Sequence, residues 1–429
     1  MGNYQSGDNT IQGERLSRRE AVFDKMDDDS FALFYAGRRK YSSGESLFPF
    51  AVNKDFYYLT GIEQEGSSLL LSKRGGECRE FLFIDPYEES KRRFYGKKLS
   101  IDEAKRLTGI PNVLLSTYLT SRLDRLLRQG LDGEEPVKKG YFDYSPELKI
   151  GPELDVKTFV NSLKVVYPDL HDLDARPLVM PLRKCKSDSE VEEIKKAAGY
   201  AKEGLLSAYS VLRPGAYLYD LGLFYEHAAN SASSCSGLCH LTHIASGEEA
   251  CYRDPFPGQK QAKEGEIVLL DVGAKSGQYG ASICRSVPVS GRYTPHQALI
   301  YKIVLNCLRA MENLARPLIS LKRINEFALD YLACECLREG LLPSKEAIYS
   351  IAYPNMVCEL GLDCPEDYGE LTLEEGDVIA LYPGLYLSGE ATAIKLKDVY
   401  LVTERGCRRL SDADIEIEDI ERRFALQSK

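Results

Sequence analysis

The sequence lacks any apolar run close to the roughly 20 residues that a membrane-spanning helix needs. Its first twenty residues are polar and lack the apolar core and small-residue cleavage site of a secretory signal. Positive charge is not in excess either, because the formal net charge is −10 at pH 7, whereas a general nucleic-acid binder needs a basic surface. These absences argue against a membrane protein, a secreted protein and a nucleic-acid partner.

Tryptophan is absent, and the 27 tyrosines that carry most of the aromatic content exclude no class of globular protein. Cysteine, in contrast, is plentiful, with twelve residues scattered along the chain. Without a secretory signal, we expect reduced thiols in a cytoplasm rather than a disulfide framework. A chain of 429 residues that is 44% hydrophobic is long enough for two domains, each with its own core.

The first part of the chain alternates helical and strand-like segments, which favours an α/β domain. Apolar residues at helical spacing predict a helix over 16–26, and short apolar and aromatic runs predict buried strands. We expect a flexible N-terminal arm over residues 1–15 and a domain over 16–174. The strands are expected at 31–36, 68–72 and 80–84, and further helices at 101–107 and 119–129.

The second part, residues 175–429, is predicted to begin with a linker over 174–189 and a long helix over 190–212. Ser187 or Ser189 can cap this helix, and Arg213-Pro214-Gly215 ends it. Further helices are expected at 218–231, 300–313 and 324–338, and strands at 267–272, 279–289, 378–381 and 399–402.

The stretch 263–291, KEGEIVLLDVGAKSGQYGASICRSVPVSG, resembles half of a metal-binding sheet. One strand delivers Asp271 toward a cleft, and the next strand returns beside it. Where a second carboxylate would be expected eleven residues later, the chain has Ser282.

Several motifs in register resemble the aminopeptidase P family. They are RREAVFDKM, FALFYAG and PFAVNKDFYYLTG, followed by LRKCKSDSEVEEIKKAAGYA, RPGA, the SGE turn, the Asp271 stretch, ELGLD and GDVIALYPGLYL. The resemblance covers nearly the whole chain. It implies an N-terminal α/β domain of the creatinase/aminopeptidase P type, which is ribonuclease H-like, and a C-terminal α+β "pita-bread" metallopeptidase domain.

The family's site implies two divalent ions, usually manganese, held by two Asp, two Glu and one His, which activate a bridging water. Asp271 is the sole family ligand that this chain retains. The other four ligand positions are filled by Ser282, Cys358, Tyr382 and Lys397. Two supporting imidazole positions carry Asp254 and Pro365.

No metal is therefore expected, since Lys397 places an ammonium where a dication should sit. A buried, unpaired Asp271 would cost several kcal/mol, so we predict an ion pair between Asp271 and Lys397. Two zinc sets are disfavoured. The set Asp271, Cys358 and Tyr382 is opposed by Lys397. The second set, CSGLCHLTH with Cys235, Cys239, His240 and His243, is expected to place its two histidines on opposite sides of a strand over 240–246.

The favoured hypothesis is a pseudoenzyme of the aminopeptidase P family, a cytoplasmic homodimer whose cleft still binds a peptide or small molecule. One alternative is an active, manganese-dependent Xaa-Pro aminopeptidase, with compensating carboxylates among Glu248, Asp254, Glu359 and Asp363. Another is a metal-independent, creatinase-like hydrolase that uses Ser282, Cys358 or Lys397.

Overall fold

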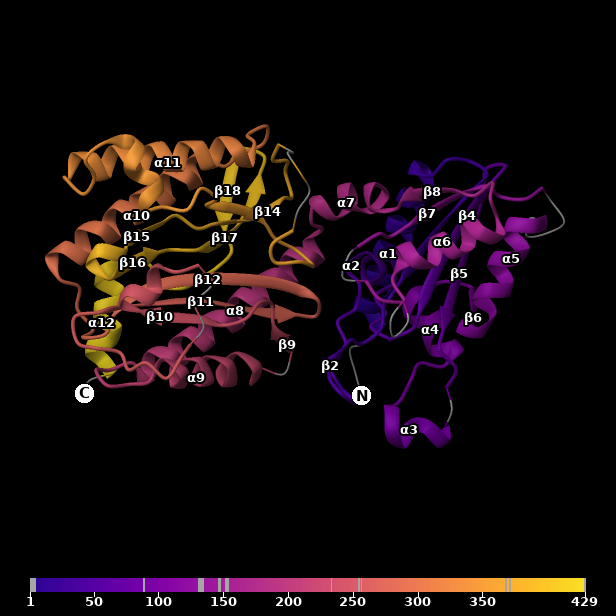
Figure 1. Cartoon of the computed structure of the whole chain (residues 1–429), viewed down its shortest axis with the longest axis horizontal. Helices are drawn as coiled ribbons and strands as arrows, with labels where there is room; N and C mark the ends of the chain where they lie inside the picture. The colour runs from indigo at the N-terminus through magenta and orange to yellow at the C-terminus, as the bar shows by residue number, and fades with distance from the viewer. Residues whose placement is uncertain are drawn as a thin grey trace. The chain divides into compact units, whose positions relative to one another are not determined.

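The computed structural model describes residues 5–87, 89–129, 135–145, 148–150, 154–232, 234–253, 255, 257–366, 369 and 372–427. The chain divides into two compact units, Met1–Arg183 and Lys184–Lys429 (Figure 1). The segment 174–189, predicted as a linker, instead contains a helix, α7 (Arg176–Lys184). No helix in the described part of the chain is long and apolar enough to cross a membrane.

Unit 1 is built on a mixed six-stranded sheet with the order β6-β5-β4-β1-β7-β8. Strand β1 pairs antiparallel with β4 and parallel with β7, so the sheet contains both antiparallel and parallel pairs. The first elements of the unit are α1 (Gln5–Lys25), β1 (Ser30–Tyr35), β2 (Tyr41–Ser43), β3 (Ser46–Leu47), α2 (Lys54–Thr60), β4 (Ser68–Arg74) and β5 (Glu77–Ile84). They are followed by α3 (Glu89–Tyr95), α4 (Ile101–Thr108), β6 (Asn112–Leu115), η1 (Ser116–Tyr118), α5 (Leu119–Gln129), β7 (Lys139–Phe142), α6 (Val156–Val166) and β8 (His171–Asp174).

The predicted strands and helices of unit 1 are present, but the first helix begins earlier than predicted. It starts at Gln5 rather than at Leu16, so the arm expected over 1–15 is helical from Gln5 onward. The residues before Leu16 are mostly polar and lack the apolar spacing by which an amphipathic helix is recognised.

Unit 2 contains two four-stranded sheets, one formed by β9 to β12 and the other with the order β13-β14-β17-β18, together with the β15–β16 pair. Its first elements are α8 (Asp188–Val211), α9 (Leu218–Asn230), β9 (Cys235–Leu238), β10 (His243–Ser246), η2 (Gly247–Cys251), β11 (Ile267–Ser276) and β12 (Tyr279–Pro288). They are followed by α10 (Pro295–Leu314), α11 (Leu321–Arg338), η3 (Lys345–Ser350), β13 (Val357–Glu359), β14 (Val378–Leu381), β15 (Gly384–Leu387), η4 (Ser388–Glu390), β16 (Thr392–Lys395), β17 (Asp398–Thr403), β18 (Gly406–Arg409) and α12 (Ile417–Gln427).

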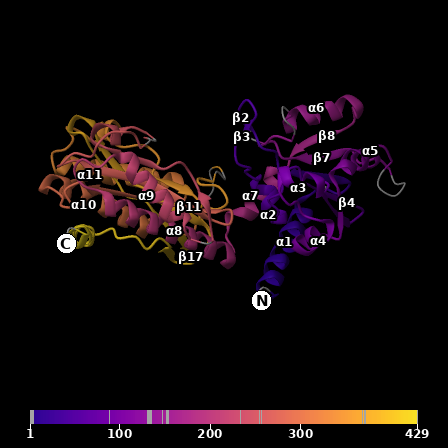
Figure 2. The same ribbon diagram turned by 90° about the horizontal axis from the view of Figure 1, so that it is seen from below.

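Helix α8 covers one face of the β11–β12 hairpin. Ser187, one of the two caps predicted, caps the helix in a capping box with Glu190. Figure 2 shows α8 and α9 side by side over these strands, and the two helices pack against each other. Because one face of the hairpin is filled by the helices, the alternate side chains of β11 and β12 are left for the opposite face.

Alternation along β11 decides which residues reach that opposite face. Leu270 and Val272 belong to the main core together with residues of α8, such as Leu205. Leu269 instead joins a small separate cluster, and Asp271 lies on its side of the strand. The opposite face of the sheet therefore carries the first candidate functional residue.

Candidate functional site

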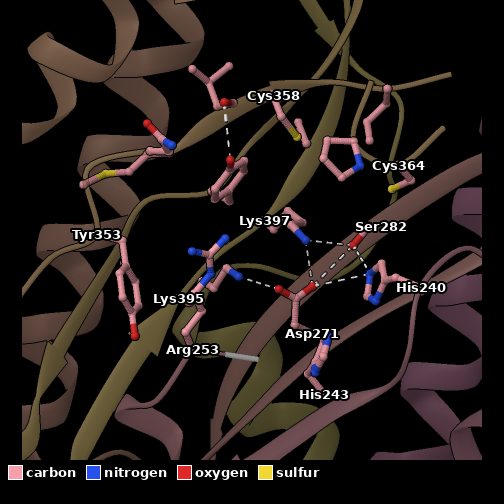
Figure 3. Close-up of a pocket in the computed structure, with 18 of the residues that line it drawn as sticks. His240, His243, Arg253, Asp271, Ser282, Tyr353, Cys358, Cys364, Lys395 and Lys397 are labelled. Atoms are coloured by element: carbon pink, nitrogen blue, oxygen red, sulfur yellow. Dashed lines mark hydrogen bonds and ion pairs between the residues drawn. The ribbon is translucent and has the colours of Figure 1, made fainter. Parts of the chain in front are cut away.

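A cavity of about 660 Å³ opens within unit 2. Asp271, Ser282, Cys358, Tyr382 and Lys397 all line it, so the structure brings together five of the six residues selected from the sequence. Figure 3 shows Asp271, Ser282, Cys358 and Lys397 in this cavity. The sixth, Asp254, lies outside the described residues. The rest of the lining includes several aromatic and cationic side chains, among them Tyr252, Arg253, Tyr353, Tyr386 and Lys395.

Asp271 is the centre of the polar network at one end of this cavity. It is only 6% exposed, and each carboxylate oxygen has an ammonium partner. Lys397 Nζ lies 2.8 Å from Oδ1, which confirms the predicted ion pair, and Lys395 Nζ lies 2.5 Å from Oδ2. The carboxylate is thus neutralised by two lysines rather than by one.

The backbone explains how Lys397 reaches Asp271 across two strands. Lys397 and Cys284 form an isolated antiparallel bridge, with both N–H···O distances at 3.1 Å. Cys284 is in turn the register partner of Asp271 in the β11–β12 hairpin. The three residues therefore lie in a row across the sheet, and the long lysine side chain spans the row to the carboxylate.

Lys395 was missed at the sequence level, although the sequence holds a signal for it. The segment Ile394-Lys395-Leu396-Lys397 alternates buried apolar residues with lysines, and both Ile394 and Leu396 are fully buried. In an extended chain, this alternation places Lys395 and Lys397 on the same face. A lysine two residues from a predicted site lysine should therefore have been assigned to the same cavity.

The protonation states of Asp271 and Lys397 are set by the ion pairs that they form in this cluster. Burial alone would raise the pKa of Asp271, but the ammonium groups of Lys395 and Lys397 outweigh burial and hold that pKa well below its usual range. Burial favours the neutral form of Lys397, yet the Asp271 carboxylate raises the pKa of this lysine above its usual value. At neutral pH the cluster therefore contains one carboxylate and cationic lysines.

Ser282 lies beside Asp271 and in contact with His240. Its Oγ is 2.8 Å from His240 Nε2 and accepts a hydrogen bond from Lys397 Nζ at 2.9 Å. Burial and the nearby Lys397 ammonium lower the pKa of His240, so the imidazole is neutral. Its Nδ1 lies 2.7 Å from the carbonyl oxygen of Leu241, which assigns the proton to Nδ1 and leaves Nε2 to accept from the serine hydroxyl.

The position of His240 corrects a sequence-based expectation. We expected a strand over 240–246 with His240 and His243 on opposite sides, but β10 begins only at His243. The two imidazole rings instead stack, with centroids 5.7 Å apart and planes 17° from parallel. Strand alternation does not apply across the irregular residues before His243, so both rings reach the same wall of the cavity.

Cys358 and Tyr382 line the same cavity. Burial raises the pKa of the Cys358 thiol to about 12, so this residue is a protonated thiol and a poor nucleophile. The Tyr382 hydroxyl donates a hydrogen bond to the carbonyl oxygen of Val357 at 3.3 Å. Its ring centroid lies 5.5 Å from Lys395 Nζ and 5.6 Å from Lys397 Nζ, within the range of cation–π attraction.

Of the carboxylates considered as replacement ligands, Asp254 lies outside the described residues, and Glu248, Glu359 and Asp363 form no ligand group with Asp271. Glu248 accepts a hydrogen bond from the Tyr252 hydroxyl at 3.3 Å. Glu359 lines the cavity, but burial and the nearby Asp377 raise its pKa to about 7. Within the described ranges, no three or more His, Cys, Asp or Glu side chains are grouped so that they could hold a metal ion.

The donor set therefore does not fit the pair of divalent cations that the family would bind. Hard dications need several carboxylate or imidazole ligands, whereas the carboxylate here is already bound on both oxygens by ammonium groups. The same positive charge opposes the zinc set of Asp271, Cys358 and Tyr382. What the cluster offers chemically is a hydrogen-bonded serine and imidazole, together with cationic donors on a cavity wall.

Comparison with known proteins finds a family match in each of the two units. The family described as "Aminopeptidase P, N-terminal domain" matches residues 16–134, and "Metallopeptidase family M24" matches residues 192–404. The chain is 27% identical to a Xaa-Pro aminopeptidase of Escherichia coli (strain K12), over 92% of this chain and 93% of that protein. It is 24% identical to intermediate cleaving peptidase 55 of Schizosaccharomyces pombe, over 95% of this chain and 86% of that protein.

Solved structures agree with these matches over almost the whole chain. A provisionally assigned aminopeptidase P of Bacillus anthracis superposes with a TM-score of 0.92 at 29% identity, covering 97% of this chain and 99% of that one. An aminopeptidase P of E. coli in its low-pH form superposes with a TM-score of 0.87 at 25% identity and the same coverage. The expected fold class, an N-terminal α/β domain followed by a pita-bread domain, is thereby confirmed.

Proposed function

Because the chain belongs to the aminopeptidase P family, we propose that it is a member without metal-dependent peptidase activity, whose cleft binds a peptide end or a small molecule. The observation that carries this proposal is the double ion pair of Asp271 with Lys395 and Lys397. Two ammonium groups take up both oxygens of the one family ligand that remains.

Electrostatics opposes the return of the metal to this cluster. A dication approaching Asp271 would have to displace two lysines and would then be held beside their uncompensated positive charges. The family's water-activating chemistry requires the opposite arrangement, with several anionic ligands around the ions. Loss of that chemistry therefore follows from the charge of the cluster and not only from missing ligands.

The cleft itself supports a binding role. Its volume of about 660 Å³ lies in the ordinary range for small-molecule sites, roughly 300–1,000 Å³. Its wall combines apolar and aromatic side chains, including Tyr353 and Tyr386, with polar and charged ones, including the cluster around Asp271. That combination suits a small ligand that has both an apolar part and a polar part.

A metal-independent hydrolase is the second candidate function, and one contact favours it. The Ser282 hydroxyl lies 2.8 Å from a neutral His240 Nε2, within reach of proton transfer from a nucleophile to a base. Lys397 Nζ, 2.9 Å from the same oxygen, could stabilise negative charge there. Ser282 is only 1% exposed, however, so an approaching carbonyl would meet a buried nucleophile.

We expect no hydrolysis of Xaa-Pro peptides above the uncatalysed rate, with or without added manganese. The test follows release of the N-terminal residue from a short Xaa-Pro peptide by mass spectrometry, with the E. coli Xaa-Pro aminopeptidase as the positive control. Manganese-dependent turnover would contradict the proposal. Turnover without metal that is lost in Ser282→Ala would establish the second candidate in its place.

The proposal also includes a cytoplasmic location and a homodimer. All twelve cysteines carry free thiols, which is consistent with a reducing compartment. For the domain organisation, we propose that the two units fold around their own cores, as each has a separate apolar cluster.

A further inference from the structure

We infer that Cys239 and Cys364 are an oxidative modification site, at which hydrogen peroxide converts two thiols into a reversible disulfide. The site lies in unit 2 and goes beyond the proposed function, because it needs neither a ligand nor a metal. Its two cysteines come from segments that are far apart in the sequence. Cys239 lies between β9 and β10, and Cys364 follows β13.

The two side chains meet beside Gly280, near the start of β12. A Cβ atom placed on this glycine would lie 2.9 Å from Cys239 Cβ and 3.3 Å from Cys364 Cβ, so both cysteines flank the same point of the backbone. The Cys364 thiol donates a hydrogen bond to the Cys239 sulfur, which places the two sulfur atoms side by side. Such neighbours need little movement to form a disulfide, whose Cβ atoms lie about 3.5–4.5 Å apart.

Hydrogen bonds hold both cysteine segments against the β11–β12 hairpin. The backbone N–H of Cys239 donates to the Gly273 carbonyl at 3.4 Å, and its thiol donates to the Ala281 carbonyl at 3.4 Å. The segment of the second cysteine is held by the Gly280 N–H, which donates to the Gly361 carbonyl at 2.9 Å. Gly273 leaves room for the first thiol, since a Cβ atom there would collide with Cys239 Sγ. The hairpin therefore keeps the two thiols adjacent.

A small oxidant can reach this pair from the cavity. Cys364 lines the cavity of about 660 Å³, and Figure 3 shows its side chain there. Both members of the pair are partly exposed, in contrast to Cys284, Cys307 and Cys336, which are fully buried. Because oxidation of a thiol requires access as well as thiolate character, we expect this pair to react before the buried cysteines.

The hydrogen bond between the two thiols assigns their roles. This bond to Cys239, together with burial, holds the pKa of Cys364 well above its usual range, so Cys364 keeps its proton at neutral pH. Cys239 is therefore the thiol that attacks the peroxide, and Cys364 is the resolving thiol. In a reducing compartment the pair stays reduced, and a disulfide formed there is transient.

The reaction consumes one hydrogen peroxide and both thiols. The Cys239 thiolate attacks a peroxide oxygen, so that an S–O bond forms, the O–O bond breaks and hydroxide leaves. The Cys364 sulfur then loses its proton and attacks the sulfenic acid, so that the S–S bond forms, the S–O bond breaks and a second hydroxide leaves. The two hydroxides take up the two thiol protons. The products are one disulfide and two waters, and the thiols supply the two electrons that reduce the peroxide.

The disulfide would join two segments that both border the cavity. His240 follows Cys239 directly, Glu366 lies two residues after Cys364, and both His240 and Glu366 line the cavity. A covalent link between these segments restricts their local opening. We therefore expect oxidation to slow amide hydrogen exchange in residues 360–366, and reduction to reverse this change.

Differential alkylation of the full-length protein tests the inference. Reduced protein is treated with hydrogen peroxide, the remaining thiols are blocked, and every cysteine peptide is analysed by mass spectrometry before and after reduction. We expect a linked peptide that contains Cys239 and Cys364 and is cleaved by dithiothreitol. It should form at least about tenfold faster than Cys307 and Cys336 are oxidised, because these two are fully buried.

Variants separate the two roles. Cys364→Ser removes the resolving thiol, so a sulfenic acid should persist at Cys239 and react with dimedone. Cys239→Ser should leave Cys364 reduced under the same treatment. Cys78→Ser, at an exposed cysteine of β5, is the matched control and should form the linked peptide at the unaltered rate. Thermal unfolding of each variant verifies that it is folded.

Three results would overturn the inference. The first is that both thiols stay reduced at a peroxide concentration that oxidises Cys78. The second is that Cys239 in the unaltered protein stops at a sulfenic acid or pairs with a cysteine other than Cys364. The third is equally fast oxidation of Cys307 and Cys336, since the reaction would then follow unfolding. None of these results bears on the proposed loss of peptidase activity, which manganese-dependent hydrolysis contradicts, so the two proposals can fail separately.

Discussion

Replacing Asp271 with asparagine is expected to lower the free energy of unfolding of unit 2 by about 2–4 kcal/mol. The substitution keeps the shape of the side chain but leaves two ammonium groups close together without their anion. Breaking a buried ion pair from one side typically costs about 3–5 kcal/mol, and partial exposure of the lysines to the cavity reduces that figure. Lys395→Met and Lys397→Met should each cost less, because one ion pair survives in each variant.

This change is measured in unit 2 alone when urea unfolding is monitored by hydrogen exchange in peptides from β11 and β12. That readout is needed because a chain with two units need not unfold in a single transition. The triple variant Asp271→Asn, Lys395→Met, Lys397→Met should recover most of the loss, since no buried charge of the cluster remains. A variant at an exposed lysine of α11, Lys322→Met, is the control. If Asp271→Asn were as stable as this control, the ion pairs would contribute nothing to stability.

The same ion pairs give the stability of unit 2 a defined pH dependence. The pKa of Asp271 in the folded protein lies below its unfolded value of about 3.9. The folded state therefore binds fewer protons, and the stabilisation is present above about pH 4 and is lost as the pH falls below that value. Asp271→Asn should remove this part of the acid sensitivity.

Restoring the family's ligands is expected to restore manganese binding, but only when Lys395 is also neutralised. The restoring set is Ser282→Asp, Cys358→His, Tyr382→Glu and Lys397→Glu, at the positions that match the family's motifs. With Lys395→Met added, manganese affinity should rise at least about 100-fold over the unaltered chain, equivalent to about 2.7 kcal/mol. The carboxylates then supply the negative charge that a pair of dications needs.

The quadruple variant, which has the four restored ligands and keeps Lys395, is the matched comparison. Its Lys395 ammonium, 2.5 Å from Asp271 Oδ2 in the present structure, would still compete for one ligand oxygen. We expect the quadruple variant to bind manganese more weakly than the quintuple variant that also carries Lys395→Met. Calorimetry and electron paramagnetic resonance of the free ion measure the binding. Equal binding by both variants would show that Lys395 does not block the metal.

Much of the fold could be predicted because local patterns and global packing agree. The β11–β12 hairpin was visible in the sequence as two apolar runs around a turn, and helix α8 as an apolar face with a serine cap. The start of α1 was wrong because its first turns carry no apolar stripe. Such polar turns look like an unstructured arm when only periodicity is available.

The site was predicted in part, and the gaps have physical reasons. Motif register located Asp271 and Lys397, and the charge argument predicted their ion pair, which the structure confirms. Lys395 was overlooked because it matches no ligand position, although strand alternation places it beside Lys397. The contact of His240 with Ser282 depends on an irregular segment before β10, where neither strand nor helix periodicity applies.

The metal content of the purified chain tests the central claim most directly. The protein is incubated with manganese, cobalt and zinc, dialysed without chelator, and analysed by inductively coupled plasma mass spectrometry. Because ammonium groups occupy both oxygens of Asp271, we predict less than about a tenth of an equivalent of any of these metals per chain. One or two equivalents that persist through dialysis and are removed by a chelator would contradict the account.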